Sequence, residues 1–307
     1  MNGSSQQPSK QDLVRWCSIP AGQLASYPGR KAELIIGRDQ ESLHKILCDA
    51  LVQELLEHNA AGKPTRWILP CHAGMFDPFV RRINAERISL KNLYIFHMDD
   101  FLDWQGRPLP VKAAFTSCKG IMQAQLYDRI SPELNVPQAQ RHFPDIHDPD
   151  ALDEDIAKIG GIDTLVGGVG CKGMVAFCEA PRSAYHRITM EEYARSKTRI
   201  VQIHEDTIVA YAEREFGGCY DAIPPMAITI GMSSMLKAQR AFFVVATGAW
   251  KQTVIRVAMF SEPTLEYPVT LITNAMPCTI LANEASADHV LSHMPPPDSL
   301  TQKEALV

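Results

Sequence analysis

Acidic side chains follow directly after an apolar run, in the segment His97-Met98-Asp99-Asp100. A carboxylate held at the end of a buried strand, beside a ligand crevice, can act as a general base. The alternative is a polar strand end in which an aspartate caps a helix. Neighbouring residues of an extended chain point to opposite sides, so at most one of Asp99 and Asp100 faces a ligand. No metal site is predicted, because His97 and Asp99 have no identifiable third ligand.

The glycine-rich segment Gly167-Gly168-Val169-Gly170 is a second candidate. Glycines allow a backbone to approach a ligand closely and to present its N–H groups to an anion. A packing turn would use the same residues. The chain continues with Lys172 directly after the turn and Glu179 further along. These two side chains are candidates for catalysis, and the alternative is an ion pair that holds the loop.

Lys251 is a third candidate, because it comes near the start of a predicted helix and three residues after Gly248. A cation at a helix N-terminus opposes the helix dipole, so helix stability does not explain it. An anionic ligand bound between the lysine and the helix amides would explain it. The alternative is a solvated surface lysine.

The elements that must position these residues alternate between short apolar runs and amphipathic stretches, as βα units do. Strands are predicted at 32–36, 67–69, 93–96, 164–166, 199–203, 227–230, 242–246 and 279–282. A helix capped by Asp39 runs to about residue 59, and further helices are predicted at 79–85, 113–126, 150–159, 207–216, 232–238, 250–260 and 284–294.

The strand at 242–246 shows no polar alternation, which is typical of a parallel sheet covered on both faces. Ligands in such sheets bind beyond the carboxyl ends of the strands. The loops expected to form a site are therefore 70–76, 97–101, 167–179 and 247–251. We predict a single open α/β domain over residues 11–294, with a disordered tail at 1–10 and a flexible, proline-rich tail at 295–307.

Composition excludes several classes of protein. The chain has 307 residues, of which 46% are hydrophobic, and its 35 acidic and 30 basic residues give a formal net charge of −5. This balance lacks the basic face that a nucleic-acid partner requires. No apolar run is long enough for a membrane span, and no signal peptide is evident. The eight cysteines are scattered without a CxxC pair, so we expect reduced thiols and a cytoplasmic location.

Several motifs together resemble the glucosamine-6-phosphate deaminase family, a relative of the 6-phosphogluconolactonases. Residues 96–101 are similar to the family's F-N-M-D-E-Y, and residues 167–179 to its G-G-V-G-N-D-G-H-I-A-F-N-E. Thr198-Arg199-Ile200, the segment 227–231 and Gly248-Ala249-Trp250-Lys251 also match. The motifs occur in the family's order and span roughly residues 32–293.

The resemblance implies an open three-layer α/β/α sandwich with a mostly parallel sheet, and no metal or nucleotide cofactor. It implies an enzyme that opens the ring of an aminohexose 6-phosphate, moves a proton between C2 and C1 and releases ammonia. Asp99 matches the base that abstracts the C2 proton, Glu179 the carboxylate that supports the ring-opening histidine, and Lys251 a lysine that binds the substrate phosphate. The implied partner is a small sugar phosphate, and the resemblance leaves open whether the protein forms a homo-oligomer.

The departures from the family concern ring opening and phosphate binding. The family's ring-opening histidine is Met174 here and its aspartate partner is Lys172, and methionine cannot transfer a proton. The same histidine serves the lactonases, which disfavours that activity. The family's phosphate loop L-P-[TS]-G-G-[TS] is Leu69-Pro70-Cys71-His72-Ala73-Gly74 here. A family arginine aligns near Glu213, with Arg214 one position away, which is about 100° around a helix.

The sequence therefore predicts an aldose–ketose isomerase or deaminase acting on a modified sugar phosphate, with Asp99 as base. Ring opening would be spontaneous, or the substrate acyclic, or Lys172 would assist by stabilising charge. The alternative is a non-catalytic, regulatory sugar-phosphate-binding protein. Substrate contacts are expected in the phosphate loop, at the aspartate that follows Asp99, in the glycine turn and at two basic positions. These residues are His72, Ala73, Gly74, Asp100, Gly168, Gly170, Arg214 and Lys251.

Overall fold

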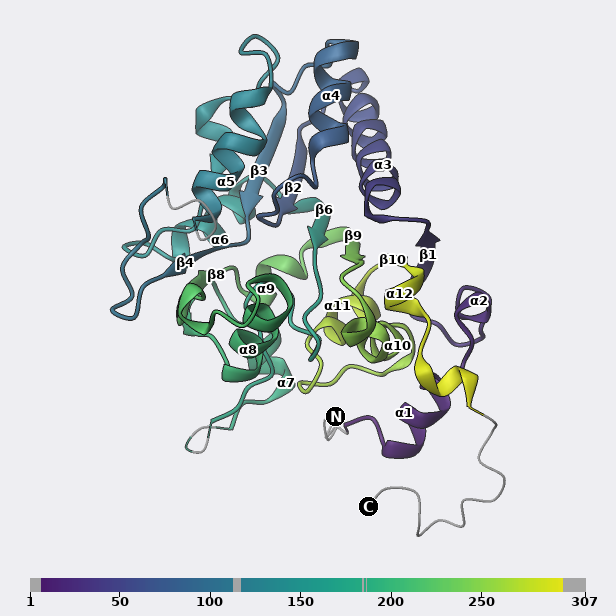
Figure 1. The fold of residues 1–307 in the computed structure, drawn as a ribbon. Coiled ribbons are helices and arrows are strands. Elements are labelled where there is room, and N and C mark those ends of the chain that lie inside the picture. The colour runs from purple at the N-terminus through teal and green to yellow at the C-terminus, as the bar shows by residue number, and fades with distance from the viewer. Residues whose placement is uncertain (1–6, 113–116, 184, 186, 295–307) are drawn as a thin grey trace.

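The computed structural model describes residues 7–112, 117–183, 185 and 187–294 (Figure 1). A seven-stranded, fully parallel sheet forms its centre. The strand order across the sheet is β1 (Glu33–Gly37), β10 (Cys278–Asn283), β9 (Ala238–Val245), β6 (Ile162–Gly167), β2 (Thr65–Leu69), β3 (Leu93–His97) and β5 (Arg141–His142). All the predicted strands of this sheet are present, and β5 is an additional edge strand in the segment between α5 (Cys118–Gln125) and α6 (Asp150–Lys158).

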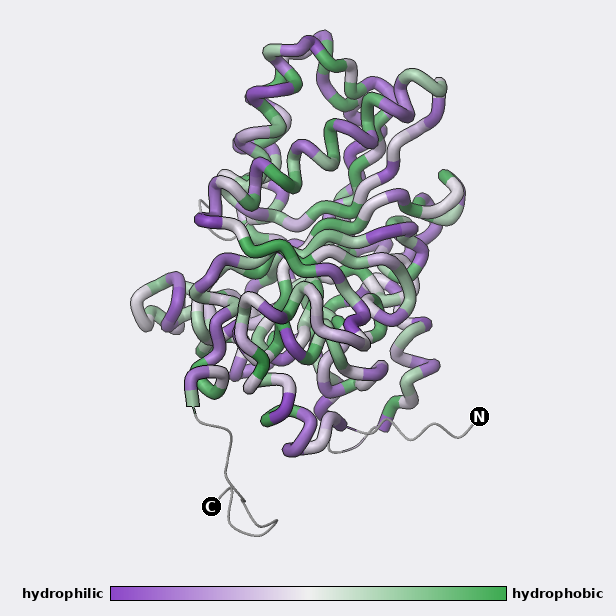
Figure 2. The backbone as a smooth tube through the Cα atoms, turned by 90° about the vertical axis from the view of Figure 1, so that its right-hand side faces the viewer, coloured by the Kyte–Doolittle hydropathy of each residue, from purple (hydrophilic) through white to green (hydrophobic). Residues whose placement is uncertain are grey.

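Helices cover both faces of this sheet, which gives the predicted three-layer, single-domain arrangement (Figures 1 and 2). One face packs against α3 (Gln40–Ala60), α4 (Asp77–Glu86) and α5 (Cys118–Gln125). The other face packs against helices that include α1 (Lys10–Cys17), α6 (Asp150–Lys158), α9 (Met232–Met235), α10 (Gln252–Phe260) and α11 (Val269–Ala275). Shorter helices are α2 (Ala21–Leu24), α7 (Met190–Ala194) and α12 (Glu284–Ala287).

Each central strand is buried on both sides, as its continuous apolar sequence predicts. Along β2, Trp67 and Leu69 belong to the core under α3 and α4, whereas Ile68 belongs to the core on the opposite face. The long helix α3 begins where the sequence places it, because Asp39 accepts a hydrogen bond from the backbone N–H of Ser42 and the Ser42 side chain completes a capping box.

A second, three-stranded antiparallel sheet lies beside the first and was not anticipated. It consists of β4 (Asp99–Leu102), β8 (Met226–Thr229) and β7 (Arg199–Gln202), and α8 (Glu205–Glu215) follows β7. The sequence predicts the last two strands but not their separate sheet, and it predicts a loop at 97–101. Only Met98 separates β3 from β4: its N–H donates to Leu69 in the large sheet, and its carbonyl accepts from Ile230 after β8.

Two boundaries near the chain ends differ from the predictions. The predicted helix at 284–294 is interrupted, because Asp288 is extended (ψ 97°) and a 3₁₀ turn over Val290–His293 begins after it. Helix α1 already includes Lys10, which shortens the predicted N-terminal tail. Residues 1–6, the start of the predicted helix at 113–126 and the tail at 295–307 lie outside the described residues.

A buried arginine joins the N- and C-terminal parts of the chain. The guanidinium of Arg256 on α10 is fully buried and donates to the carbonyls of Trp16, Ile19, Gln252 and Ala287. These acceptors come from the end of α1, the segment after it, α10 and α12, so one side chain satisfies carbonyls of three helices. No helix in the described part of the chain is long and apolar enough to span a bilayer.

Candidate active site

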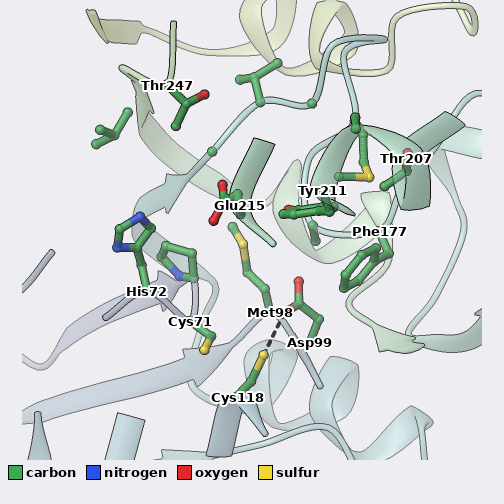
Figure 3. Close-up of a pocket in the computed structure, with 18 of the residues that line it drawn as sticks. Cys71, His72, Met98, Asp99, Cys118, Phe177, Thr207, Tyr211, Glu215 and Thr247 are labelled. Atoms are coloured by element: carbon green, nitrogen blue, oxygen red, sulfur yellow. Dashed lines mark hydrogen bonds between the residues drawn. The ribbon is translucent and has the colours of Figure 1, made fainter. Parts of the chain in front are cut away.

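A cavity of about 350 Å³ opens at the carboxyl ends of β2, β3, β6 and β9 (Figure 3). All four loops expected from the sequence contribute to its wall. Helices α5 and α8 supply further lining residues that were not foreseen. The site therefore lies where ligands bind in open α/β sheets.

Asp99 lies in this cavity, at the first position of β4 and opposite Thr229 of β8. Its Oδ1 accepts a hydrogen bond from the Cys118 thiol, with 3.5 Å between sulfur and oxygen (Figure 3). Burial raises the pKa of Asp99 to about 7, and the neighbouring Asp100 carboxylate adds to this effect. A carboxyl with a pKa near neutrality is suited to accept and return a proton.

Asp100 has a structural position, in contrast to the prediction that it contacts substrate. Its carboxylate accepts from the backbone N–H groups of Cys118 (2.7 Å) and Lys119 (3.3 Å), which are the first residues of α5. It also accepts from the N–H of Phe101. A carboxylate at a helix N-terminus satisfies otherwise unpaired amides, so Asp100 fixes α5 against β4.

The predicted phosphate loop reaches the cavity only in part. Cys71, His72 and Ala73 line it, whereas Gly74 does not. The positive φ of 78° at Gly74 instead allows the turn that leads into α4. The His72 ring nitrogen Nδ1 lies 2.8 Å from the carbonyl oxygen of Ala73, so the imidazole folds back on its own loop.

The glycine turn after β6 forms another wall, through both Gly168 and Gly170. A Cβ at Gly170 would lie only 3.0 Å from the Cβ of Met174. The close approach of these two residues explains the glycine, and the Met174 side chain lines the cavity beside it. The position at which the resemblance requires a proton-transferring histidine is thus occupied by a thioether within the site.

Lys251 lies at the start of α10 and lines the cavity, as the sequence predicts. Its ammonium group donates to the carbonyl of Val169 and lies 3.8 Å from the centre of the Trp250 ring. Burial lowers its pKa to about 8, so the group is mostly charged at pH 7. Among the described residues that line the cavity, Lys251 is the only lysine or arginine.

Helix α8 presents a different set of side chains from the one predicted. Thr207, Tyr211 and Glu215 line the cavity, and their spacing of four residues places them on one stripe of the helix (Figure 3). Arg214 is exposed, and its guanidinium lies 6.0 Å from the Trp250 ring instead of lining the cavity. The four-residue spacing of these side chains is visible in the sequence. It identifies them as site residues only when α8 is known to lie over the cavity.

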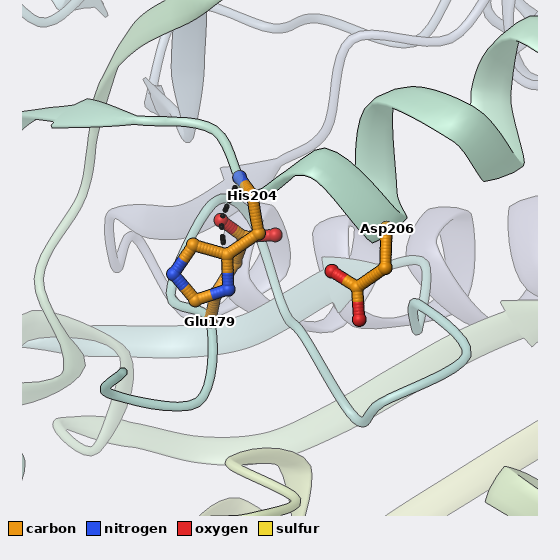
Figure 4. A group of neighbouring side chains, drawn as sticks. All are labelled: Glu179, His204 and Asp206. Atoms are coloured by element: carbon orange, nitrogen blue, oxygen red, sulfur yellow. Dashed lines mark hydrogen bonds and ion pairs between the residues drawn. The ribbon is translucent and has the colours of Figure 1, made fainter. Parts of the chain in front are cut away.

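Glu179 lies behind the cavity wall. One carboxylate oxygen accepts from the backbone N–H of His204 at 2.9 Å (Figure 4). The other accepts from the hydroxyl of Thr207. Glu179 therefore reaches the cavity only through Thr207. Lys172 is turned outward and pairs with Glu266, at 3.8 Å, so the structure brings neither predicted charged residue to the cavity.

Glu179, His204 and Asp206 form a group whose potential ligand atoms lie within 4.8 Å of one another (Figure 4). Protein donors already engage its carboxylates: the hydroxyl and N–H described above hold Glu179, and Arg182 pairs with Asp206 at 3.0 Å. This arrangement fits a helix start at α8, where carboxylates stabilise the first turn.

Comparison with known proteins finds relatives named glucosamine-6-phosphate deaminase. A glucosamine-6-phosphate deaminase of Caenorhabditis elegans is 27% identical over 236 residues, which covers 74% of this chain and 80% of the relative. A glucosamine-6-phosphate deaminase of Porphyromonas gingivalis is 27% identical over 262 residues, or 82% and 92% of the two chains. Over most of its length, the chain is thus similar in sequence to curated glucosamine-6-phosphate deaminases. No family model matches it.

Solved structures of other proteins share the fold of this chain. A monomeric glucosamine-6-phosphate deaminase superposes with a TM-score of 0.65 at 18% identity, over 82% of this chain and 98% of its own. A 6-phosphogluconolactonase from Trypanosoma cruzi superposes with a TM-score of 0.60 at 16% identity, over 83% and 95% of the two chains. The deaminase family and the lactonases share this architecture.

Proposed function

We propose that this protein catalyses a C2-to-C1 proton transfer on a sugar phosphate, as an aldose–ketose isomerase or deaminase in which Asp99 is the base. The observation that carries the proposal is the Asp99 carboxyl in the cavity, with a pKa raised to about 7 by burial. The relation to the glucosamine-6-phosphate deaminases supports the substrate class.

In the proposed complex, the phosphate lies against Lys251 and the glycine turn at 168–170. Lys251 has three N–H donors, and Val169 takes one of them, so two are left for phosphate oxygens. The open-chain sugar extends from there toward Asp99. The carboxylate removes the proton from C2, the electron pair forms the C1–C2 double bond, and the C1 oxygen takes a proton from water, which gives an enediol or an enolamine. The Asp99 carboxyl, whose proton exchanges with solvent in part while the intermediate is bound, then gives a proton to C1. C2 becomes a ketone, with loss of its hydroxyl proton, or an iminium.

Ring opening is the step for which this chain lacks the expected group. Met174 cannot donate or accept a proton, and Lys172 points toward Glu266 outside the cavity. The proposed substrate is therefore an open-chain sugar phosphate, or a cyclic one that opens spontaneously. The proposed steps use no cofactor.

A non-catalytic sugar-phosphate-binding protein is the second candidate. The observation that favours it is the thioether of Met174 in the cavity, together with the engagement of Glu179 by Thr207 and His204. Binding would be retained by such a protein, whereas proton transfer would not.

Exchange of the C2 or C1 hydrogen in D₂O distinguishes the two candidates. Fructose 6-phosphate and glucosamine 6-phosphate are incubated with the protein, and deuterium incorporation is followed by NMR. We expect incorporation with the unchanged protein and none with Asp99→Asn. Asp103→Asn, on the surface beyond β4, is the matched control and retains exchange. Binding of both sugars without any incorporation would favour the non-catalytic candidate.

A further inference from the structure

We propose that the Cys118 thiol positions the Asp99 carboxylate and sets the pH range in which that carboxylate works as a base. This inference rests on the proposed function for its catalytic consequence. The geometry that carries it is a buried thiol, anchored by its own backbone, that donates to one oxygen of a cavity carboxylate.

The position of Cys118 is fixed from two sides. Its backbone N–H donates to the Asp100 carboxylate at 2.7 Å. Cys118 is also the first residue of α5, and the Ser117 side chain caps this helix by accepting from the N–H of Gly120. Asp99 and Asp100 are consecutive residues of β4, so one strand supplies both the anchor for the Cys118 backbone and the acceptor for its thiol. The sulfur lies 3.5 Å from Oδ1 of Asp99, which leaves Oδ2 for the cavity (Figure 3).

The Cys118 thiol remains a donor at neutral pH. Its pKa is raised by the neighbouring Cys71 thiol, by burial and by the negative charge of Asp99. A protonated thiol is a weak hydrogen-bond donor, in contrast to the hydroxyl of serine or the ammonium of lysine. Cys118 therefore orients the carboxylate while giving its anion little stabilisation, so burial still dominates and the base titrates near neutrality.

The other groups around Asp99 are consistent with this assignment. Asp100 on the same strand disfavours the Asp99 anion, whereas the Cys118 hydrogen bond is the influence that favours it. The remaining titratable groups that line the cavity or interact with Asp99 come from the loop after β2, the loop after β6, α8 and the start of α10: Cys71, His72, Cys171, Cys178, Tyr211, Glu215 and Lys251.

The test compares Cys118→Ser with Cys118→Ala, in the full chain, and uses Cys219→Ser as the control. Cys219 is exposed and lies outside the cavity wall. The protonation of Asp99 is followed directly through its carboxyl infrared band from pH 4 to pH 9, with Asp99→Asn identifying the band. The pH dependence of sugar-phosphate hydrogen exchange is measured in parallel.

We expect serine to lower the titration midpoint of Asp99 by about one pH unit, because a stronger donor stabilises the anion. Alanine, which removes the donor, raises the midpoint. The acid limb of the exchange profile moves by the same amounts, while KM is unchanged and Cys219→Ser behaves like the parent protein. A structural role alone would lower stability without moving either midpoint.

Identical Asp99 midpoints in the parent protein, Cys118→Ser and Cys118→Ala would overturn the inference. A midpoint that moves in the same direction for both variants would also overturn it. Serine is a stronger hydrogen-bond donor than cysteine and alanine has no donor, so the inference requires opposite shifts. The infrared titration needs no turnover. If the unchanged protein exchanges no hydrogen, the proposed function fails, and the role of Cys118 is still decided by the titration.

Discussion

Replacing Asp99 with asparagine should stabilise the protein, and increasingly so as the pH rises. The carboxyl has a pKa of about 7 in the folded chain, against an ordinary value of 3.8. Between these values the folded protein holds a proton that the unfolded chain releases, so the free energy of unfolding falls as the pH rises from about 4 to 7. Below pH 4 the carboxyl is protonated in both the folded and the unfolded state. Above pH 7 the folded protein bears the full free-energy cost of the ionised Asp99.

The size of this effect follows from the difference between the two pKa values. A gap of about three units corresponds to at most about 4 kcal/mol at pH 8, and to about 1.5 kcal/mol at pH 5. Asparagine has nearly the same shape and cannot ionise, so Asp99→Asn removes the penalty. We therefore expect its gain in stability over the parent protein to grow by about 2.5 kcal/mol between pH 5 and pH 8.

Urea unfolding at the two pH values measures this difference. Asp103→Asn provides a control of opposite sign, because hydrogen bonds from Arg107 lower the pKa of Asp103. Its replacement should reduce stability at both pH values, since both lie above the pKa of the free aspartate. If Asp99→Asn changes stability equally at pH 5 and pH 8, the carboxyl does not titrate between them, and the argument that it is poised as a base fails.

Three further substitutions and one rate comparison test the rest of the site and the fold. Lys251→Met should weaken binding of a sugar phosphate by about 10- to 100-fold in calorimetry and leave the neutral sugar nearly unaffected; equal losses for both would assign the lysine a structural role. Glu215→Gln should tighten phosphate binding several-fold at pH 7 by removing a like charge from the cavity wall, and unchanged affinity would place the phosphate elsewhere. Ammonia release from glucosamine 6-phosphate should be about 10²- to 10⁴-fold slower than in an ordinary family deaminase because Met174 transfers no proton, and an equal kcat would refute this. Arg256→Met should lower the free energy of unfolding by at least about 3 kcal/mol, since four buried carbonyls lose their donor, and a loss below 1 kcal/mol would contradict that count.

The sequence predicts the large sheet well and the small sheet poorly, for a physical reason. A strand buried on both faces has a continuous apolar signature, and the turn and capping residues around it, such as Asp39, mark its neighbours. The strand at 99–102 is short and begins with two aspartates, so its pairing with β8 depends on contacts distant in sequence. Local patterns do not contain that information.

The same limit applies to the candidate site. The loops that end the parallel strands could be located, and Lys251 and the glycine turn do line the cavity. Cys118 and Glu215 could not be found, because they enter the site through the placement of α5 and α8. Glu179 was expected in the cavity from its motif alone, but the hydroxyl of Thr207 and the start of α8 hold it behind the wall.

The single residue between β3 and β4 makes the two sheets one cooperative unit. The N–H of Met98 is bound to the large sheet through Leu69, and its carbonyl is bound to the small sheet through Ile230 at 2.7 Å. Sliding of one sheet past the other would break both hydrogen bonds in the same event. The amide protons of Met98 and Ile230 should therefore exchange with solvent at a common, slow rate set by global unfolding. Asp99, the next residue, has its backbone position determined when the chain folds, before any ligand arrives.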